Sequence, residues 1–189
     1  MSKRKARQVL AVPVFVATAL SMLLIGCSEK DPPQVVGDVD IERYMGVWYE
    51  IAKFPVFFER GLVGVTAEYA LEKDGRIHVT NRGFKKSFEG KVSSIEGYAS
   101  VPDSENPAKL RIRFNPFPAR LFPADYWIVD LDQEYEYAVV SGPSREVLWI
   151  LSRTPSIDGT RYEDIVERLA QMGFEVDKLE KMPQPSDSS

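Results

Sequence analysis

The chain has 189 residues, of which 24 are basic, 28 are acidic and one is a histidine, and its net charge at neutral pH is −4. Hydrophobic residues make up 44% of the chain, a share that excludes a largely disordered protein and suffices for one domain with a core. The acidic balance provides no broad basic surface for a phosphate backbone, so nucleic acid is not an expected partner.

Residues 1–26 have the features of a signal peptide. Four basic residues occur within the first seven positions, and a largely apolar stretch then extends to Ile25. It ends in Leu24-Ile25-Gly26-Cys27, which resembles the lipobox of bacterial lipoproteins, where cleavage leaves a lipid-modified cysteine at the N-terminus. We therefore predict a lipoprotein signal peptide over 1–26 and lipidation of Cys27. An uncleaved membrane anchor is the alternative, since the stretch is close to spanning length.

The remainder of the chain divides into a tether, a domain and a tail. Residues 27–40 contain Pro32-Pro33 and few apolar positions, and they are predicted to form a lipidated tether. The domain is predicted over 41–182. The polar, proline-containing residues 183–189 are predicted to be a flexible tail.

Within the domain, short strands are separated by turn signals. The predicted strands cover residues 48–54, 65–72, 77–81, 90–101, 109–114, 126–131, 135–141 and 147–153. An amphipathic helix is predicted over 160–172, where Thr160 and Glu163 have the spacing of a capping box and Gly173 suits the position after the helix. A short last strand is predicted over 175–179.

The order of these elements predicts the fold class. Eight consecutive antiparallel strands followed by one C-terminal α-helix fit an all-β protein, either an up-and-down barrel or a sandwich. Sandwiches usually need some long crossing connections, whereas every connection here is short. We therefore predict an eight-stranded up-and-down antiparallel barrel, an architecture that can hold one small ligand.

Three short motifs resemble the signatures of the lipocalin family. They are Gly46-Val47-Trp48-Tyr49, then Glu134-Tyr135 with Tyr137, and finally Leu151-Ser152-Arg153. The surrounding sequence is especially similar to bacterial lipocalins and their apolipoprotein D relatives. Glu134 replaces the usual aspartate of the second motif, which leaves the local turn geometry open. Cys27 is the only cysteine, so the disulfides of apolipoprotein D relatives cannot form here.

The resemblance implies how one end of the barrel is closed. In lipocalins the arginine of the third motif packs across the tryptophan of the first, which here assigns barrel closure to Gly46, Trp48 and Arg153. A guanidinium over an indole face is attracted by about 0.5–2 kcal/mol, depending on desolvation.

If Trp48 and Arg153 point inward, the two-residue period of a strand predicts which neighbours face the interior. On the first strand Glu50, Ala52 and Phe54 are expected inside. The predicted ligand-binding residues are Tyr69, Leu71, Val79, Asn81, Ile112, Phe114, Trp149 and Glu50. The role of Glu50 stays open between a structural partner and a ligand contact, because an inward carboxylate needs a partner. Strands 90–101, 126–131 and 135–141 show no clean alternation and are left unassigned.

Three connections at the opposite end of the barrel combine aromatic residues with basic ones. These predicted mouth residues are Phe57, Phe58, Arg60, Phe84, Lys85, Phe88, Phe117, Arg120 and Phe122. Exposed apolar side chains around an opening indicate contact with a membrane or an apolar ligand. The alternative is that these phenylalanines fold back onto the barrel rim.

Catalytic and metal chemistry is not indicated. His78 is the only histidine and falls on the outward parity, so neither a histidine triad nor a multi-histidine zinc site is expected, and no cofactor motif occurs. The resemblance implies a non-enzymatic lipocalin, lipid-anchored at the bacterial outer membrane and facing the periplasm, that binds and transports a fatty acid or lysophospholipid. The alternatives are a lipocalin-derived enzyme acting on a lipophilic substrate and an envelope interaction protein with a filled barrel.

Overall fold

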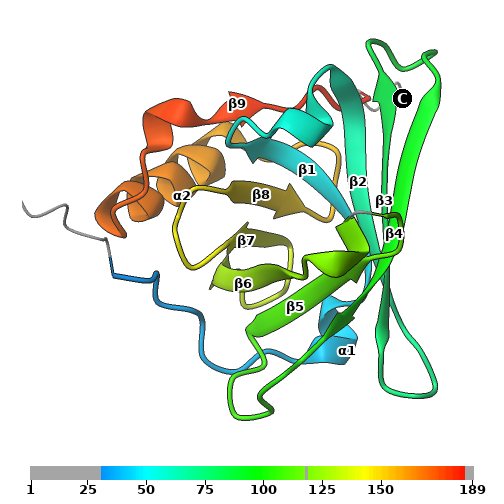
Figure 1. Ribbon diagram of the computed structural model, residues 1–189. Helices are drawn as coiled ribbons and strands as arrows, with labels where there is room; N and C mark the ends of the chain where they lie inside the picture. Colours follow the sequence, from blue (N-terminus) through cyan, green and yellow to red (C-terminus); the bar gives the residue numbers. More distant parts are fainter. Residues whose placement is uncertain (1–30, 118, 186–189) are drawn as a thin grey trace, which may run out of the picture.

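The computed structural model describes residues 31–117 and 119–185, so the predicted signal peptide and Cys27 lie outside the described residues. Eight antiparallel strands of the described chain close into a barrel with a helix against its outside (Figure 1). The barrel strands are β1 (Gly46–Lys53), β2 (Leu62–Leu71), β3 (Ile77–Lys85), β4 (Val92–Ser100), β5 (Lys109–Phe114), β6 (Ala124–Leu131), β7 (Tyr137–Ser141) and β8 (Leu148–Ser152). Consecutive strands pair, and β1 pairs with both β2 and β8. The predicted all-β barrel is confirmed.

The remaining elements are short except for one helix. They are α1 (Ile41–Tyr44), η1 (Phe57–Glu59), η2 (Ala119–Leu121), α2 (Gly159–Gln171), η3 (Val176–Lys178) and β9 (Glu180–Lys181). The predicted capping box at the start of α2 is wrong, because the side chain of Asp158 accepts the first free N–H groups instead. The strand predicted over 175–179 is also wrong: a 3-10 turn occupies most of it, and the strand lies further along.

Helix α2 explains why some strands showed no alternation. It packs its buried residues Ile165 and Leu169 onto the outside of the barrel, in one cluster with Tyr137 and Val139 of β7. The intervening β7 residues face the barrel interior. A strand covered on both faces is apolar throughout, as parallel sheets covered by helices also are, so periodicity alone does not reveal its inward side.

A β-bulge in β1 reverses the side-chain direction part way along the strand. Glu50 pairs with Leu151 of β8, but Ala52 already pairs with Ile150, so one extra residue of β1 lies between them. Ala52 and Phe54 therefore pack outside with α2, and the prediction that they face the interior is wrong. The bulge also turns the buried side chain of Lys53 towards Glu50 and Glu59.

The C-terminal segment completes the barrel wall beside Glu50. Strand β2 pairs with β1 only as far as Tyr49, and β9 pairs with the rest of β1. Beyond β9, the side-chain amide nitrogen of Gln184 donates to the backbone carbonyl oxygens of both Glu50 and Val65, each at 2.8 Å. Residue 184 is therefore held in place rather than part of a flexible tail, while 186–189 lie outside the described residues.

The N-terminal segment is also packed against the domain. The Val36 N–H donates to the carbonyl of Ile128 at 3.0 Å, and Val39 is buried. In Figure 1 this segment runs along the lower side of the barrel into α1. The latter part of the predicted tether, 27–40, thus belongs to the folded unit.

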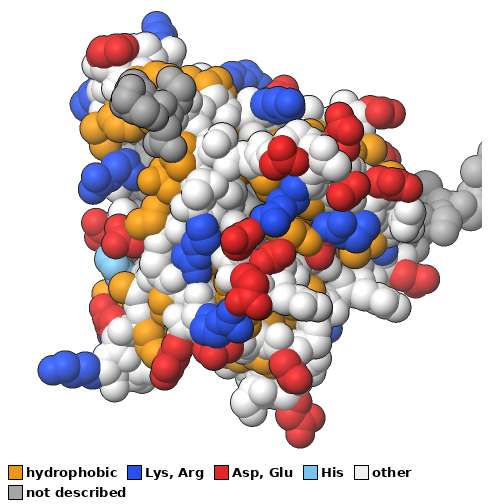
Figure 2. Space-filling view, turned by 180° about the vertical axis from the view of Figure 1, so that it is seen from behind, with side chains coloured by type: hydrophobic (Ala, Val, Ile, Leu, Met, Phe, Trp, Pro, Cys, Tyr) orange, Lys and Arg blue, Asp and Glu red, His pale blue; other side chains and the backbone are white. Residues whose placement is uncertain are grey.

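The molecular surface carries mixed charge. Figure 2 shows acidic and basic side chains interspersed over one face, with apolar side chains between them. Among residues 31–117 and 119–185, none of the helices has the length and apolar character needed to cross a bilayer.

Candidate functional site

One end of the barrel is closed by a stack of Arg153 on Trp48. The guanidinium carbon lies 3.7 Å from the centre of the indole ring, and Trp48 is fully buried. The indole N–H donates to the carbonyl oxygen of Tyr44 at 2.9 Å. Gly46 has a φ of +96°, a backbone conformation that favours glycine, and it lies beside the Arg153 guanidinium. These contacts match the closure that the family resemblance implied.

The same guanidinium ties three segments together by donating to backbone carbonyl oxygens. Its acceptors are Arg43 at 2.7 Å, Val47 at 3.1 Å and Tyr135 at 3.3 Å. Partial burial lowers the pKa of Arg153, but an arginine stays charged at neutral pH.

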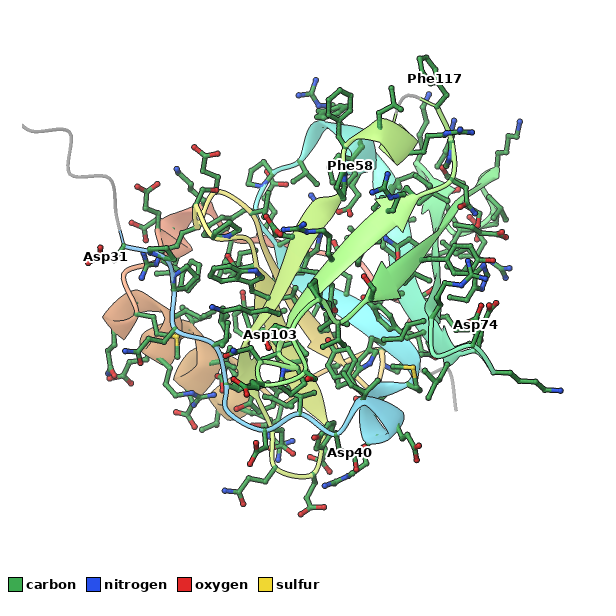
Figure 3. The ribbon with its side chains drawn as sticks, turned by 60° about the horizontal axis from the view of Figure 1, so that its bottom comes forward. Asp31, Asp40, Phe58, Asp74, Asp103 and Phe117 are labelled. Atoms are coloured by element: carbon green, nitrogen blue, oxygen red, sulfur yellow. The ribbon has the colours of Figure 1, made fainter. Side chains whose placement is uncertain are left out.

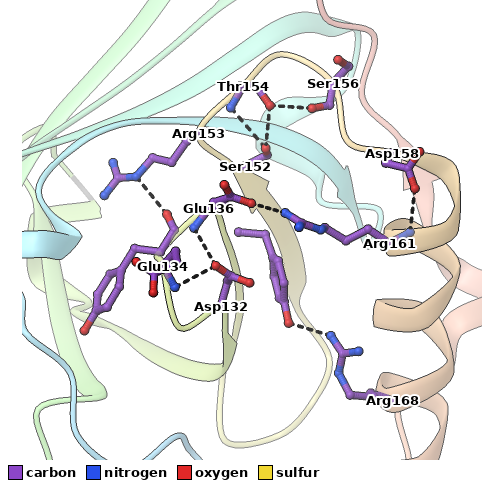
Figure 4. A network of polar contacts seen from close by, with 12 residues as sticks. Asp132, Glu134, Glu136, Ser152, Arg153, Thr154, Ser156, Asp158, Arg161 and Arg168 are labelled. Carbon is purple, nitrogen blue, oxygen red and sulfur yellow. Dashed lines mark hydrogen bonds and ion pairs between the residues drawn. The ribbon is translucent and has the colours of Figure 1, made fainter.

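The second motif forms the turn that presents the Tyr135 carbonyl. Tyr135 has a φ of +60°, and the side chain of Asp132 accepts from the N–H groups of Glu134 and Glu136 (Figure 4). The turn is thus held by Asp132, and the Glu134 side chain is free to point outward to Arg43.

Three tyrosine hydroxyls lie above the closed end. Tyr126 is 2.7 Å from Tyr44 and 2.8 Å from Tyr69, oxygen to oxygen. Burial raises the pKa of all three phenols, so they remain protonated at neutral pH. Tyr69 and Tyr126 line the cavity described next and form its polar floor.

A cavity of about 180 Å³ lies inside the barrel between this floor and the mouth. Its lining residues are Glu50, Phe58, Glu59, Val65, Ala67, Tyr69, Asn81, Ile112, Phe114, Ala124, Asp125, Tyr126, Trp149 and Leu151. Phe58 and Ala124 are exposed, and they mark where the cavity meets the surface. The cavity walls are mainly apolar and aromatic, with a few polar groups.

Most of the predicted ligand-binding residues line this cavity. Those that do are Tyr69, Asn81, Ile112, Phe114, Trp149 and Glu50. Val79 is fully buried in the inner core and is not among the lining residues. Leu71 is 43% exposed at the end of β2, so the structure places it outside the cavity. The alternation of β2 predicted the face correctly, but the strand extends past the barrel interior there.

Two carboxyl groups meet on the cavity wall. Glu50 comes from β1 and Glu59 from η1, and they are 3% and 8% exposed. The Trp149 indole N–H donates to Glu59 at 3.3 Å, and the nearby Lys53 ammonium lies 3.7 Å from Glu180 on its other side. Glu50 therefore faces the carboxyl group of Glu59 and the positive charge of Lys53.

The two carboxyl groups differ in their affinity for protons. Burial, and then the neighbouring Glu59, raises the pKa of Glu50 well above its ordinary value. Burial also raises the pKa of Glu59, but Lys53 and the Trp149 N–H oppose that rise. Because two close carboxylates resist ionising together, Glu50 retains its proton to a higher pH than an exposed glutamate does.

Glu59 and Tyr126 are site residues that the sequence did not reveal. Glu59 lies in a connection rather than a strand, so no periodicity assigns its direction. Tyr126 lies in β6, and a bulge between Ile128 and Asp130 obscures the alternation of that strand. One signal for Glu59 was available: the inward position of Glu50 required a nearby polar partner.

The predicted mouth residues gather at the end opposite the Trp48–Arg153 stack. Phe57, Phe117 and Phe122 are 84%, 77% and 73% exposed, so they do not fold back onto the rim. Figure 3 shows Phe58 and Phe117 at one end of the barrel and Asp40 at the other. The basic residues of these connections, Arg60, Lys85 and Arg120, are exposed as well, whereas Phe84 is half-buried and Phe88 is 38% exposed.

Comparison with known proteins gives a consistent result. Residues 39–184 match the family described as Lipocalin-like domain. The chain is 40% identical over 178 residues to outer membrane lipoprotein Blc of Citrobacter freundii, covering 92% of this chain and 97% of that protein. It is 32% identical over 154 residues to apolipoprotein D of Mus musculus, covering 78% of each.

Solved structures show the same architecture. Insecticyanin from the tobacco hornworm Manduca sexta superposes with a TM-score of 0.64 at 20% identity, covering 83% of this chain and 86% of that one. That likeness supports the fold alone. The family match over residues 39–184 and the 40% identity to outer membrane lipoprotein Blc show that this chain belongs to the lipocalin family.

Proposed function

We propose that this lipocalin binds and carries small amphiphiles, such as fatty acids or lysophospholipids, at the bacterial outer membrane. The observation that carries the proposal is the apolar cavity beneath a mouth of exposed aromatic and basic side chains. Each methylene moved from water into such a cavity contributes about 0.8 kcal/mol. Exposed cations at the mouth, such as Arg60 and Arg120, suit a carboxylate or phosphate that remains in water.

The size of the cavity limits how a ligand sits. Its volume of about 180 Å³ is below the roughly 300–1,000 Å³ of typical pockets for drug-sized ligands. A long acyl chain therefore extends past Phe58 into the mouth, or moves lining side chains aside. This interior space supports ligand binding over the alternative of a completely filled barrel.

The cellular location follows from the relatives and the N-terminal sequence. Proteins named outer membrane lipoprotein Blc align with almost the whole chain. In this proposal a lipid on Cys27 anchors the domain, which faces the periplasm, and Ser28 replaces the aspartate associated with inner-membrane retention. The proposed role is binding without catalysis.

The proposal can be tested by filling the cavity. Ala67 lines it, and Ala70 lies on the outer face of the same strand. We expect Ala67→Phe to weaken the displacement of a fluorescent fatty acid by lysophospholipid at least about tenfold, whereas Ala70→Phe leaves it unchanged. Saturable binding that survives Ala67→Phe in a folded protein, or no binding by the unmodified protein, would overturn the proposal.

A further inference from the structure

Three buried oxygen atoms on the cavity wall have no hydrogen-bond partner within residues 31–117 and 119–185. They are Oε1 of Glu50, Oε2 of Glu59 and Oδ1 of Asn81, and all three residues line the same cavity. A buried acceptor left without a donor lowers the stability of the folded protein. Three such atoms on one wall therefore form a place where a group bearing donor hydrogens would be stabilised.

The charges around these atoms are of both signs. Proton retention by Glu50 reduces the negative charge of the carboxyl pair, and the buried ammonium of Lys53, which also lies 3.7 Å from the exposed Glu180, opposes that charge. The remaining carboxylate of the lining, Asp125, is paired with Arg111 at 3.4 Å on the barrel exterior. Among the lining residues of the described chain there is no lysine or arginine.

From this arrangement we infer that the wall formed by Glu50, Glu59 and Asn81 is a subsite for an uncharged hydroxyl group attached to an apolar chain. A hydroxyl donates its single hydrogen to one of these free acceptors without bringing a charge into the barrel. A carboxylate has no donor and would meet the carboxyl pair, and burying an ammonium beside Lys53 adds like charge. The inference rests on the proposed amphiphile binding and specifies the chemistry of the group that enters.

Matched probes of one chain length test this subsite. Decanol, decyl methyl ether, decanoate and decylammonium would be titrated at neutral pH against a bound fluorescent fatty acid. The ether is uncharged and accepts hydrogen bonds but donates none, so its comparison with decanol isolates the donor. We expect decanol to bind about tenfold more tightly than the ether, and more tightly than either ion.

Variants connect the preference to the wall. Asn81→Leu should reduce the preference for decanol over the ether, whereas Thr80→Leu, its neighbour on the other face of β3, should not. Glu50→Gln should also reduce the preference for decanol over the ether, because the new side-chain amide can donate a hydrogen bond to the ether oxygen. Asn81→Leu leaves the carboxyl pair intact and so remains informative if Glu50→Gln fails to fold.

The outcomes separate the two proposals. If none of the probes binds saturably, amphiphile binding itself is wrong. If decanol and the ether bind equally, or if decanoate or decylammonium binds most tightly, amphiphile binding stands and the hydroxyl subsite is overturned. An unchanged preference in folded Asn81→Leu and Glu50→Gln proteins would likewise overturn it.

Discussion

The two ends of the barrel interior differ in whether their buried polar groups are hydrogen-bonded. At the closed end, the indole N–H of Trp48 and the guanidinium of Arg153 all donate to backbone carbonyl oxygens. Nearer the mouth, Glu50, Glu59 and Asn81 each leave a buried oxygen without a partner. Satisfied groups stabilise one arrangement, whereas unsatisfied groups retain binding capacity at a cost in stability.

This contrast divides the interior into a part that supports the fold and a part suited to ligand. The closed end joins α1, β1 and the turn before β7 through a single arginine. The cavity wall, in contrast, depends on a residue from the mouth connection, Glu59, whose contacts are a tryptophan N–H and another acid. Substitutions at the two ends should therefore affect different measurements.

The largest expected effect is at the closed end. Trp48→Ala removes a fully buried aromatic side chain and the stacking partner of Arg153, so we expect the free energy of unfolding to fall by about 3–5 kcal/mol. Denaturant-induced unfolding followed by circular dichroism measures this. Val47→Ala, at the exposed neighbouring position, should change it by less than about 0.5 kcal/mol. A comparable loss in both variants would contradict the assigned role of Trp48.

A smaller effect, dependent on pH, is expected at the carboxyl pair. Because the pKa of Glu50 is raised in the folded state, the folded protein retains a proton that the unfolded chain releases. The stabilising contribution is therefore complete below the ordinary pKa of 4.5 and is lost as the pH rises through the raised value. Each unit of pKa shift corresponds to about 1.4 kcal/mol.

The measurement is the free energy of unfolding as a function of pH. Above pH 4.5, the unmodified protein should lose stability relative to Glu50→Gln, which cannot titrate, as the pH rises through the raised pKa of Glu50. Glu68→Gln, on the outer face of β2, serves as the control and should follow the unmodified protein. Parallel curves for the unmodified protein and Glu50→Gln would show that the proton is not held there.

The smallest effect on stability is expected at the mouth. Replacing Phe57 and Phe117 together by serine removes apolar surface that is already in water, so the free energy of unfolding should change by less than about 0.5 kcal/mol. Sedimentation with anionic phospholipid vesicles should nevertheless show several-fold weaker binding, because exposed apolar rings at an opening favour a lipid surface. Leu71→Ser changes an exposed apolar residue at the other end and should leave vesicle binding unaltered. Equal vesicle binding by all three proteins would argue against membrane contact through the mouth.

The barrel could be predicted from local signals in the sequence, and the closed end from the family resemblance. Turn residues delimit the strands, and Trp48 and Arg153 lie in motifs whose packing the family resemblance implies. Alternation also assigned Ile112, Phe114 and Tyr69 correctly, since the strands that carry them have one polar face. Where only one face of a strand is covered, the two-residue period is enough to assign which side chains face the barrel interior.

The mouth half of the site was less predictable because its geometry depends on contacts between distant segments. The β1 bulge exists only through pairing with β8, and it reversed the expected directions of Ala52 and Phe54. The partner of Glu50 comes from a connection whose side-chain directions follow no period. The predicted boundary between domain and tail at residue 183 lies too early, because the Gln184 side chain donates to two backbone carbonyl groups of the barrel. Composition alone does not reveal such contacts.

The position of Gln184 has a practical consequence for engineering this protein. The last described residues fill the space between β1 and β2, next to the part of the cavity wall that carries Glu50. Truncating the chain before Pro183 would therefore leave a gap in the barrel wall between β1 and β2. A fusion partner is better joined after residue 185.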